Sequence, residues 1–287
     1  MTTCLFASDI HGKIERYQSL FAAILEKRPD AVFLGGDLLP PAIASMAKST
    51  NFIEDFIGTY LVGQFAAIQE ILGEKYPEIF VIMGNDDGRY EEHAIFSGER
   101  AGLWHYAHNR KFSYRGYDIY GYAYIPPTPF LLKDWERYDV SIYVDPGCVS
   151  PEQGVRTIGV SEYDVKYMTI AEDLDSLTIG DNLDRAVFLF HAPPYNTKLD
   201  LAALAGKMID HVPLDPHVGS IAIRRFIESR QPFLTLHGHV HESASLTGCW
   251  QDRIGNTLLF SAAHDGPELS LIEFQLENTE TATRILI

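Results

Sequence analysis

The part of the sequence that decides the fold is the stretch Thr235-Leu236-His237-Gly238-His239-Val240-His241-Glu242-Ser243. The apolar run 232–236 stops there on histidines, and imidazole is the commonest side-chain ligand for transition metals. Gly238 would let the backbone turn tightly, so that His239 and His241 could point to one place from a loop. Two such histidines alone are more often solvated loop residues, so the metal interpretation depends on the rest of the chain.

Four earlier apolar runs end on polar residues in the same way. They cover residues 4–7, 31–34, 79–83 and 186–190, and they predict buried strands. A helical pattern from Ile14 to Leu25 separates the first two runs, and this order favours parallel pairing in an α/β sheet. Ligands gather beyond the carboxyl ends of such strands, although each polar residue taken singly is more often a cap or turn residue. The residues that follow the four runs are Asp9-x-His11, Gly36-Asp37, Gly84-Asn85 and His191.

The rest of the chain predicts a single domain, 1–287, with a helical insertion near 41–75. Acidic and amide side chains interrupt the apolar face of the insertion, which favours a helix packed on the core over a membrane span. No internal repeat or Pro/Gly linker splits the chain. Further predicted features are partly antiparallel aromatic strands around Arg115-Gly116, an irregular segment at 138–159, a capping box at Thr169-Ile170-Ala171-Glu172, a helix at 219–229, and closing strands at 257–260 and 269–274.

The composition excludes several classes of protein. The chain has 287 residues, 46% apolar and 22% charged, which is typical of a globular protein. Its net charge of −16 repels polyanions, so binding to duplex nucleic acid or to an anionic membrane is not expected. Cys4, Cys148 and Cys249 are too few and too far apart for a disulfide framework. The N-terminus shows no secretory signal, which predicts a cytoplasmic protein, and nothing in the sequence indicates the oligomeric state.

The five blocks of polar residues, in this order, resemble the calcineurin-like metallophosphoesterase family. They lie between residues 4 and about 243, and 237–243 with His191-Ala192-Pro193-Pro194 is similar to the bacterial and archaeal phosphoesterase branch. The resemblance implies an α/β fold, a four-layer αββα sandwich in which two mixed β-sheets are flanked by helices. It also implies two metal ions, one held by Asp9, His11 and His241, the other held by Asn85, His191 and His239, with Asp37 bridging them.

Such a set of ligands suits the hydrolysis of a phosphate ester. Two cations ~3.5–4 Å apart repel each other, and a shared carboxylate with a metal-bridging hydroxide offsets the repulsion. Mixed imidazole and oxygen donors favour Mn, Fe, Zn or Co over Mg. The bridging hydroxide is expected to attack phosphorus in line, and no phosphoenzyme is needed.

One position departs from the pattern of the family. Most members carry a histidine after the asparagine, which helps to neutralise the departing alkoxide, and this chain has Asp86 there. Asp86 is therefore a catalytic candidate, but an aspartate beside two cations should stay ionised and donate a proton poorly. A supporting or turn role is favoured for it. Other candidates for the missing donor are His93, His217 and His264.

Three functions remain open at this point. The first is a dinuclear-metal phosphoesterase that hydrolyses a small phosphomonoester or phosphodiester. The second is a weakly active or inactive metal-binding scaffold of the same fold, which the complete set of seven ligand positions disfavours. The third is a nuclease, which is disfavoured by the negative net charge and by the absence of a cluster of basic residues in the sequence. The predicted partner is therefore a small phosphate-ester substrate.

Overall fold

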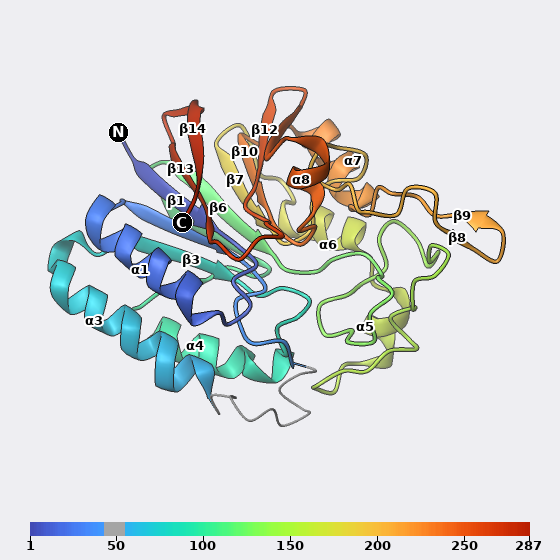
Figure 1. Ribbon diagram of the computed structural model, residues 1–287, viewed down its shortest axis with the longest axis horizontal. Coiled ribbons are helices and arrows are strands. Elements are labelled where there is room, and N and C mark those ends of the chain that lie inside the picture. Colours follow the sequence, from blue (N-terminus) through green and yellow to red (C-terminus); the bar gives the residue numbers. More distant parts are fainter. Residues whose placement is uncertain (43–54) are drawn as a thin grey trace.

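The computed structural model describes residues 1–42 and 55–287 as two six-stranded mixed sheets flanked by helices (Figure 1). The first sheet has the order β14-β13-β1-β2-β3-β4, in which β1 to β4 are parallel and β13 pairs antiparallel with both β1 and β14. Its strands are β1 (Thr3–Ala7), β2 (Ala31–Gly35), β3 (Glu78–Ile82), β4 (His105–Tyr106), β13 (Ser270–Gln275) and β14 (Asn278–Leu286).

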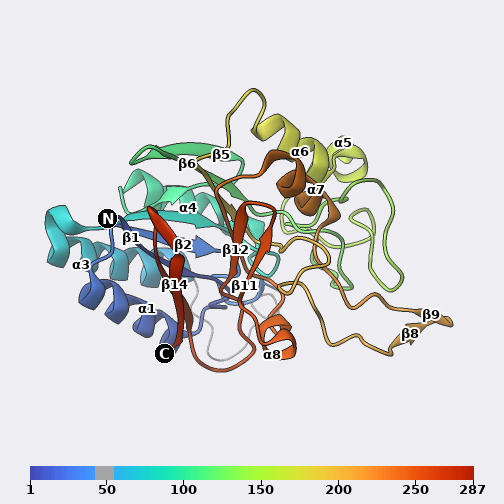
Figure 2. The same cartoon turned by 90° about the horizontal axis from the view of Figure 1, so that it is seen from above.

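The second sheet has the order β11-β12-β10-β7-β6-β5, with parallel pairing from β12 to β6 and an antiparallel strand at each edge. Its strands are β5 (Arg110–Tyr114), β6 (Tyr117–Tyr122), β7 (Ala186–Phe190), β10 (Leu234–His237), β11 (Gln251–Ile254) and β12 (Thr257–Ser261). A separate hairpin of β8 (Met208–Ile209) and β9 (Val212–Pro213) extends away from both sheets (Figures 1 and 2).

Helices cover the two sheets on opposite sides, with α1 and α3 on one side and α6 and α7 on the other (Figure 2). The α-helices are α1 (Ile14–Lys27), α3 (Val62–Leu72), α4 (Glu92–Arg100), α5 (Glu162–Tyr167), α6 (Ile170–Leu177), α7 (Ile221–Arg230) and α8 (Ser243–Thr247). Shorter turns of other helix types are η1 (Phe56–Leu61), η2 (Gly73–Lys75) and η3 (Arg89–Glu91). The predicted four-layer sandwich is therefore confirmed.

The core lies between the sheets and under the helices because the central strands are apolar on both faces. Every residue of β2 and β7 is buried, as expected for parallel strands covered on both sides. The rings of Phe260 and Phe274, one from each sheet, meet edge to face with centroids 5.8 Å apart. This packing sets the two sheets against each other and fixes the relative position of the loops at their ends.

Most of the predicted elements form where the sequence indicated them. The capping box at Thr169 and Glu172 is present at the start of α6, and Ser220 caps α7. In the predicted helical region 41–75, residues 43–54 lie outside the described residues, and residues 56–75 form η1, α3 and η2. Within residues 1–42 and 55–287, no helix is both long and apolar enough to cross a membrane.

Candidate metal centre

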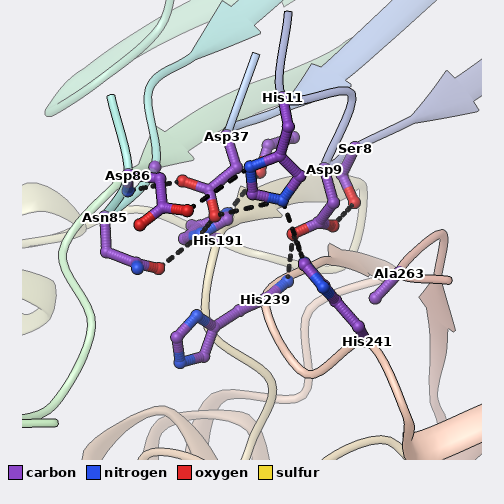
Figure 3. A network of polar contacts seen from close by, with 12 residues as sticks. Ser8, Asp9, His11, Asp37, Asn85, Asp86, His191, His239, His241 and Ala263 are labelled. Carbon is purple, nitrogen blue, oxygen red and sulfur yellow. Dashed lines mark hydrogen bonds and ion pairs between the residues drawn. The ribbon is translucent and has the colours of Figure 1, made fainter. Parts of the chain in front are cut away.

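The seven predicted ligands all lie in loops just beyond the carboxyl ends of strands, where the ends of the two sheets come together (Figure 3). The first sheet supplies four residues and the second supplies three, and the hydrogen bond between His191 Nδ1 and the carbonyl oxygen of Gly35 (2.8 Å) joins the two. Since β1, β2 and β3 are parallel neighbours, their carboxyl ends fall together. Asp9 and His11 follow β1, Asp37 follows β2, Asn85 follows β3, His191 follows β7, and His239 and His241 follow β10.

One half of the centre consists of Asp9, His11, Asp37 and His241, whose donor atoms all lie within 4.8 Å of one another. The Nε2 atoms of His11 and His241 are 3.1 Å apart, and Nε2 of His241 is 3.2 Å from Oδ1 of Asp9. Asp9 and Asp37 are buried. Two carboxylates and two imidazoles at this spacing are a suitable donor set for a transition-metal cation.

The other half is arranged around His191, which is fully buried. Its Nε2 is 3.0 Å from Oδ1 of Asn85 and 3.4 Å from Oδ2 of Asp37. The same Oδ2 of Asp37 is 3.9 Å from Nε2 of His11, so this single oxygen lies between the two halves. His239 joins the group through its backbone N–H, which donates to Oδ1 of Asp9 (2.9 Å), and its ring centroid is 5.3 Å from that of His191. Figure 3 shows no polar contact of the His239 ring with the labelled residues.

The neighbouring histidines keep the carboxylates of Asp9 and Asp37 ionised. Burial alone would raise the pKa of Asp9, but the hydrogen bond with His241 and the charge of His191 hold that pKa well below its usual range. Burial would likewise raise the pKa of Asp37, and His191 lowers it. Burial opposes the protonation of His191 and His239. The charge of Asp37 helps to outweigh burial at His191, whose pKa rises to about 9. At His239 burial prevails, and its pKa falls to about 3. Ionised carboxylates among imidazoles form an environment that attracts cations.

Four of the seven residues have a left-handed backbone, which side chains other than glycine rarely adopt. The φ angles are 56° at Asp9, 53° at His11, 50° at Asp37 and 73° at His239. Each such conformation costs about 1–3 kcal/mol of folding free energy, and it persists only where the surrounding contacts hold it in place. Here the loops brace each other, since the N–H of Asp9 donates to the carbonyl of Gly36 (2.9 Å) and the N–H of His11 donates to that of Asp37 (2.8 Å).

Gly238 has a different role from the tight turn that was expected. The left-handed residue of this loop is His239, whereas Gly238 lies where another chain segment approaches closely. A Cβ atom at position 238 would be 2.6 Å from Oδ2 of Asp9 and from Oγ of Ser8. The glycine therefore lets the loop after β10 contact the loop after β1.

Gly84 makes the same kind of close approach, and its replacement by alanine should disturb the centre. The added Cβ would lie 2.4 Å from the backbone nitrogen of Asp37 and 2.6 Å from Cε1 of His191. We expect G84A to lose about 1–3 kcal/mol of unfolding free energy, as overpacked cores do, and to bind metal at least tenfold more weakly. Urea denaturation and metal titration would measure both effects.

Gly63 of α3 provides the matched control for this substitution, because no atom of residues 1–42 and 55–287 outside its own helix lies within 4 Å of a Cβ at that position. G63A should raise the free energy of unfolding by about 0.5–1 kcal/mol and leave metal binding unchanged. Equal behaviour of G84A and G63A would contradict the role assigned to Gly84.

Asp87, which sequence reasoning missed, stabilises the loops that carry Asp37 and Asn85. It is fully buried and accepts hydrogen bonds from the N–H groups of Leu38 (3.2 Å), Leu39 (2.7 Å) and Gly84 (2.8 Å). Burial and the charge of Asp37 raise the pKa of Asp87 to about 8. This side chain ties the loop after β2 to the loop after β3. The available signal was the second aspartate in the polar block that follows β3.

Arg16 of α1 was also missed, and it supports the loop after β1. Its buried guanidinium donates to the carbonyl oxygens of Asp9 (2.5 Å), Gly266 (2.5 Å) and Pro267 (3.2 Å). Two of these partners lie about 250 positions away in the chain. No local sequence pattern could therefore have indicated this contact.

Asp86 lies beside the predicted ligand residues, with Oδ2 3.4 Å from Nδ1 of His11. Its backbone N–H donates to Oδ1 of Asp37 (2.7 Å). The histidines considered as alternative proton donors have polar partners outside the seven residues, namely the Tyr90 carbonyl for His93, Asp200 for His217, and Glu268 for His264.

The two-sheet sandwich and the Asp/His group at its edge define a class of protein, and sequence comparison identifies the class. A model described as calcineurin-like phosphoesterase matches residues 2–243, so the chain belongs to this family of metal-dependent phosphoesterases. A curated relative, the uncharacterized protein MJ1162 of Methanocaldococcus jannaschii, is 35% identical over 85 residues, which is 29% of this chain. The match spans only 33% of the length of that relative.

Solved structures of low sequence identity share the fold. TT1561 of Thermus thermophilus superposes with a TM-score of 0.56 at 17% identity, covering 99% of this chain and 98% of the other. A dimetal phosphatase from Danio rerio has a TM-score of 0.52 at 11% identity, covering 95% and 91% respectively. At such identities the likeness establishes the architecture alone.

Proposed function

We propose that this chain is a dinuclear metal-dependent phosphoesterase that hydrolyses a small phosphomonoester or phosphodiester. The observation that carries the proposal is the position of Asp37 Oδ2, which lies between Nε2 of His11 (3.9 Å) and Nε2 of His191 (3.4 Å). A carboxylate oxygen in that place can be shared by two cations. Membership of the calcineurin-like phosphoesterase family supports the same assignment.

The proposal assigns the residues in two groups. Asp9, His11 and His241 would hold one cation, and Asn85, His191 and His239 would hold the other, with Asp37 shared. The donors fit such cations, because carboxylate, amide oxygen and imidazole together suit Mn, Fe, Zn or Co. When bound, the cation pair would supply an activated water and stabilise the charge on the phosphoryl oxygens.

The protein's own residues would orient this chemistry. Asp37 keeps one oxygen for sharing because its other oxygen, Oδ1, accepts the N–H of Asp86 (2.7 Å). His191 is fixed by its hydrogen bond to the Gly35 carbonyl (2.8 Å), which leaves Nε2 directed at Asn85 and Asp37. His239 would complete the second group from the same loop as His241.

The test is a screen of metal-reconstituted protein. Protein stripped with a chelator is reloaded separately with Mn, Fe, Zn or Co, and bound metal is counted on the sample that is assayed. We expect two cations per chain and hydrolysis of p-nitrophenyl phosphate or of its bis ester. H239A should lose one cation and most of the activity, whereas H93A, a histidine bonded to the Tyr90 carbonyl, should lose neither.

Other outcomes would favour the other functions. Two bound cations without hydrolysis of either ester would favour a metal-binding scaffold and overturn the proposal. Faster cleavage of a short single-stranded oligonucleotide than of both esters would favour a nuclease. Binding of no more than one cation in every metal form would remove the dinuclear assignment.

A further inference from the structure

Asp86 replaces the histidine that most family members carry, and its contacts point to a different role from that of the histidine. Its carboxylate oxygen Oδ2 faces Nδ1 of His11 at 3.4 Å, and its backbone N–H donates to Oδ1 of Asp37 at 2.7 Å (Figure 3). One residue thus contacts two of the proposed ligand residues, which lie in the loops after two different strands, β1 and β2.

The two nitrogens of His11 face different surroundings. Nδ1 faces the carboxylate of Asp86, whereas Nε2 faces Nε2 of His241 (3.1 Å) and Oδ2 of Asp37 (3.9 Å). A neutral imidazole carries a proton on only one nitrogen, and an ionised carboxylate can only accept. A carboxylate beside Nδ1 therefore favours the tautomer in which Nε2 is free to bind a cation.

We propose that Asp86 is a positioning residue that holds His11 in its metal-binding tautomer and orientation, while its backbone N–H leaves Oδ2 of Asp37 as the shared oxygen. This inference rests on the proposed function. It assigns Asp86 to the cation held by Asp9, His11 and His241, and not to proton donation. His11 is partly exposed, and the carboxylate of Asp86 lies against its Nδ1.

Three variants separate this role from a general effect of charge. D86A removes the carboxylate that faces Nδ1 of His11, D86N keeps an oxygen there without the charge, and D175N removes one charge from an exposed residue of α6. In the described part of the chain, the side chain of Asp175 has no hydrogen bond or ion pair, which makes it a matched control. The probe is Zn²⁺ alone, titrated against a competing chelator with no substrate present.

We expect D86A to weaken one of the two zinc sites by roughly 10–100-fold, which is typical for loss of a residue that orients a ligand. D86N should bind zinc at that site at least threefold more tightly than D86A, and D175N should match the unaltered protein. Co²⁺-loaded protein gives an independent readout. The exchangeable imidazole N–H signal of His11 should be observed in the unaltered protein and be lost by solvent exchange in D86A.

The zinc titrations also distinguish failure of the proposed function from failure of the positioning role of Asp86. If the unaltered protein fails to bind two zinc ions, the proposed function fails before any variant is considered. If it binds two, the positioning role is overturned by D86A binding both ions within threefold of the unaltered protein. It is equally overturned if D86N binds no more tightly than D86A, or if D86A loses both sites to the same extent.

Discussion

Replacing Asp37 with asparagine is expected to lower phosphoesterase activity by on the order of 10³-fold, because the proposed cation pair would supply several kcal/mol of transition-state stabilisation. D37N keeps the size of the side chain and an acceptor for the N–H of Asp86. It removes the charge whose Oδ2 atom lies between His11 and His191. Without that charge, two cations would repel each other and one of them should be lost. Steady-state kinetics with p-nitrophenyl phosphate and metal counting on the same sample would measure both effects.

The D175N variant controls for the loss of one negative charge, and circular dichroism of the metal-free proteins would establish that both variants are folded. D175N should retain both cations and full activity. If D37N retains two cations and more than a tenth of the activity, Asp37 is not the shared ligand.

The second large effect concerns the leaving group. Asp86 points its carboxylate toward His11, and the three other candidate donors have partners outside the centre. None of these four candidates is placed by a described contact as a proton donor to a leaving alkoxide. Since a general acid contributes roughly 10²–10⁴-fold, aryl phosphates should react faster than alkyl phosphates by about that factor. A series of esters spanning a range of alcohol pKa values, measured as kcat/KM, would give the slope.

Introducing the histidine found in most family members should reduce this preference. At saturating metal, D86H should raise the alkyl-to-aryl rate ratio, because imidazole can donate a proton near neutral pH. The ratio is the informative quantity, since the substitution also removes the Asp86 contact with His11. A flat dependence on alcohol pKa in the unaltered protein, with chemistry rate-limiting, would contradict the absence of a proton donor.

The sequence was informative about the fold where apolar runs were short and ended abruptly. The five runs before the polar blocks form β1, β2, β3, β7 and β10, because strands buried on both faces must be apolar throughout. The edge strand β14 was not predicted, since its side chains are mostly exposed and polar. The helix α4 was also missed. It contains Gly98, and its packing depends on the ring of Trp104, which fills the space where a Cβ would lie.

The identities of the candidate site residues were predictable, but the way they are held was not. Ligand side chains follow strand ends, and strand ends can be located by pattern. The loops that carry these side chains are held instead by residues from distant parts of the chain. Asp87 accepts a hydrogen bond from the Leu39 N–H, and Arg16 donates one to the Gly266 carbonyl. The left-handed backbone of Asp9 and Asp37 is another such feature, because residue type alone does not indicate it outside glycine.

The proposed ligands are divided between the two sheets, and this division has a consequence for the unliganded protein. Cations bound by residues of both layers would cross-link them without a covalent bond, so metal binding and rigidity would be thermodynamically coupled. Chelation should therefore speed amide hydrogen exchange at the carboxyl ends of β2 and β7 while the interior of each layer stays protected. Metal supply would then govern how long the native chain resists proteolysis as well as how fast it turns over substrate.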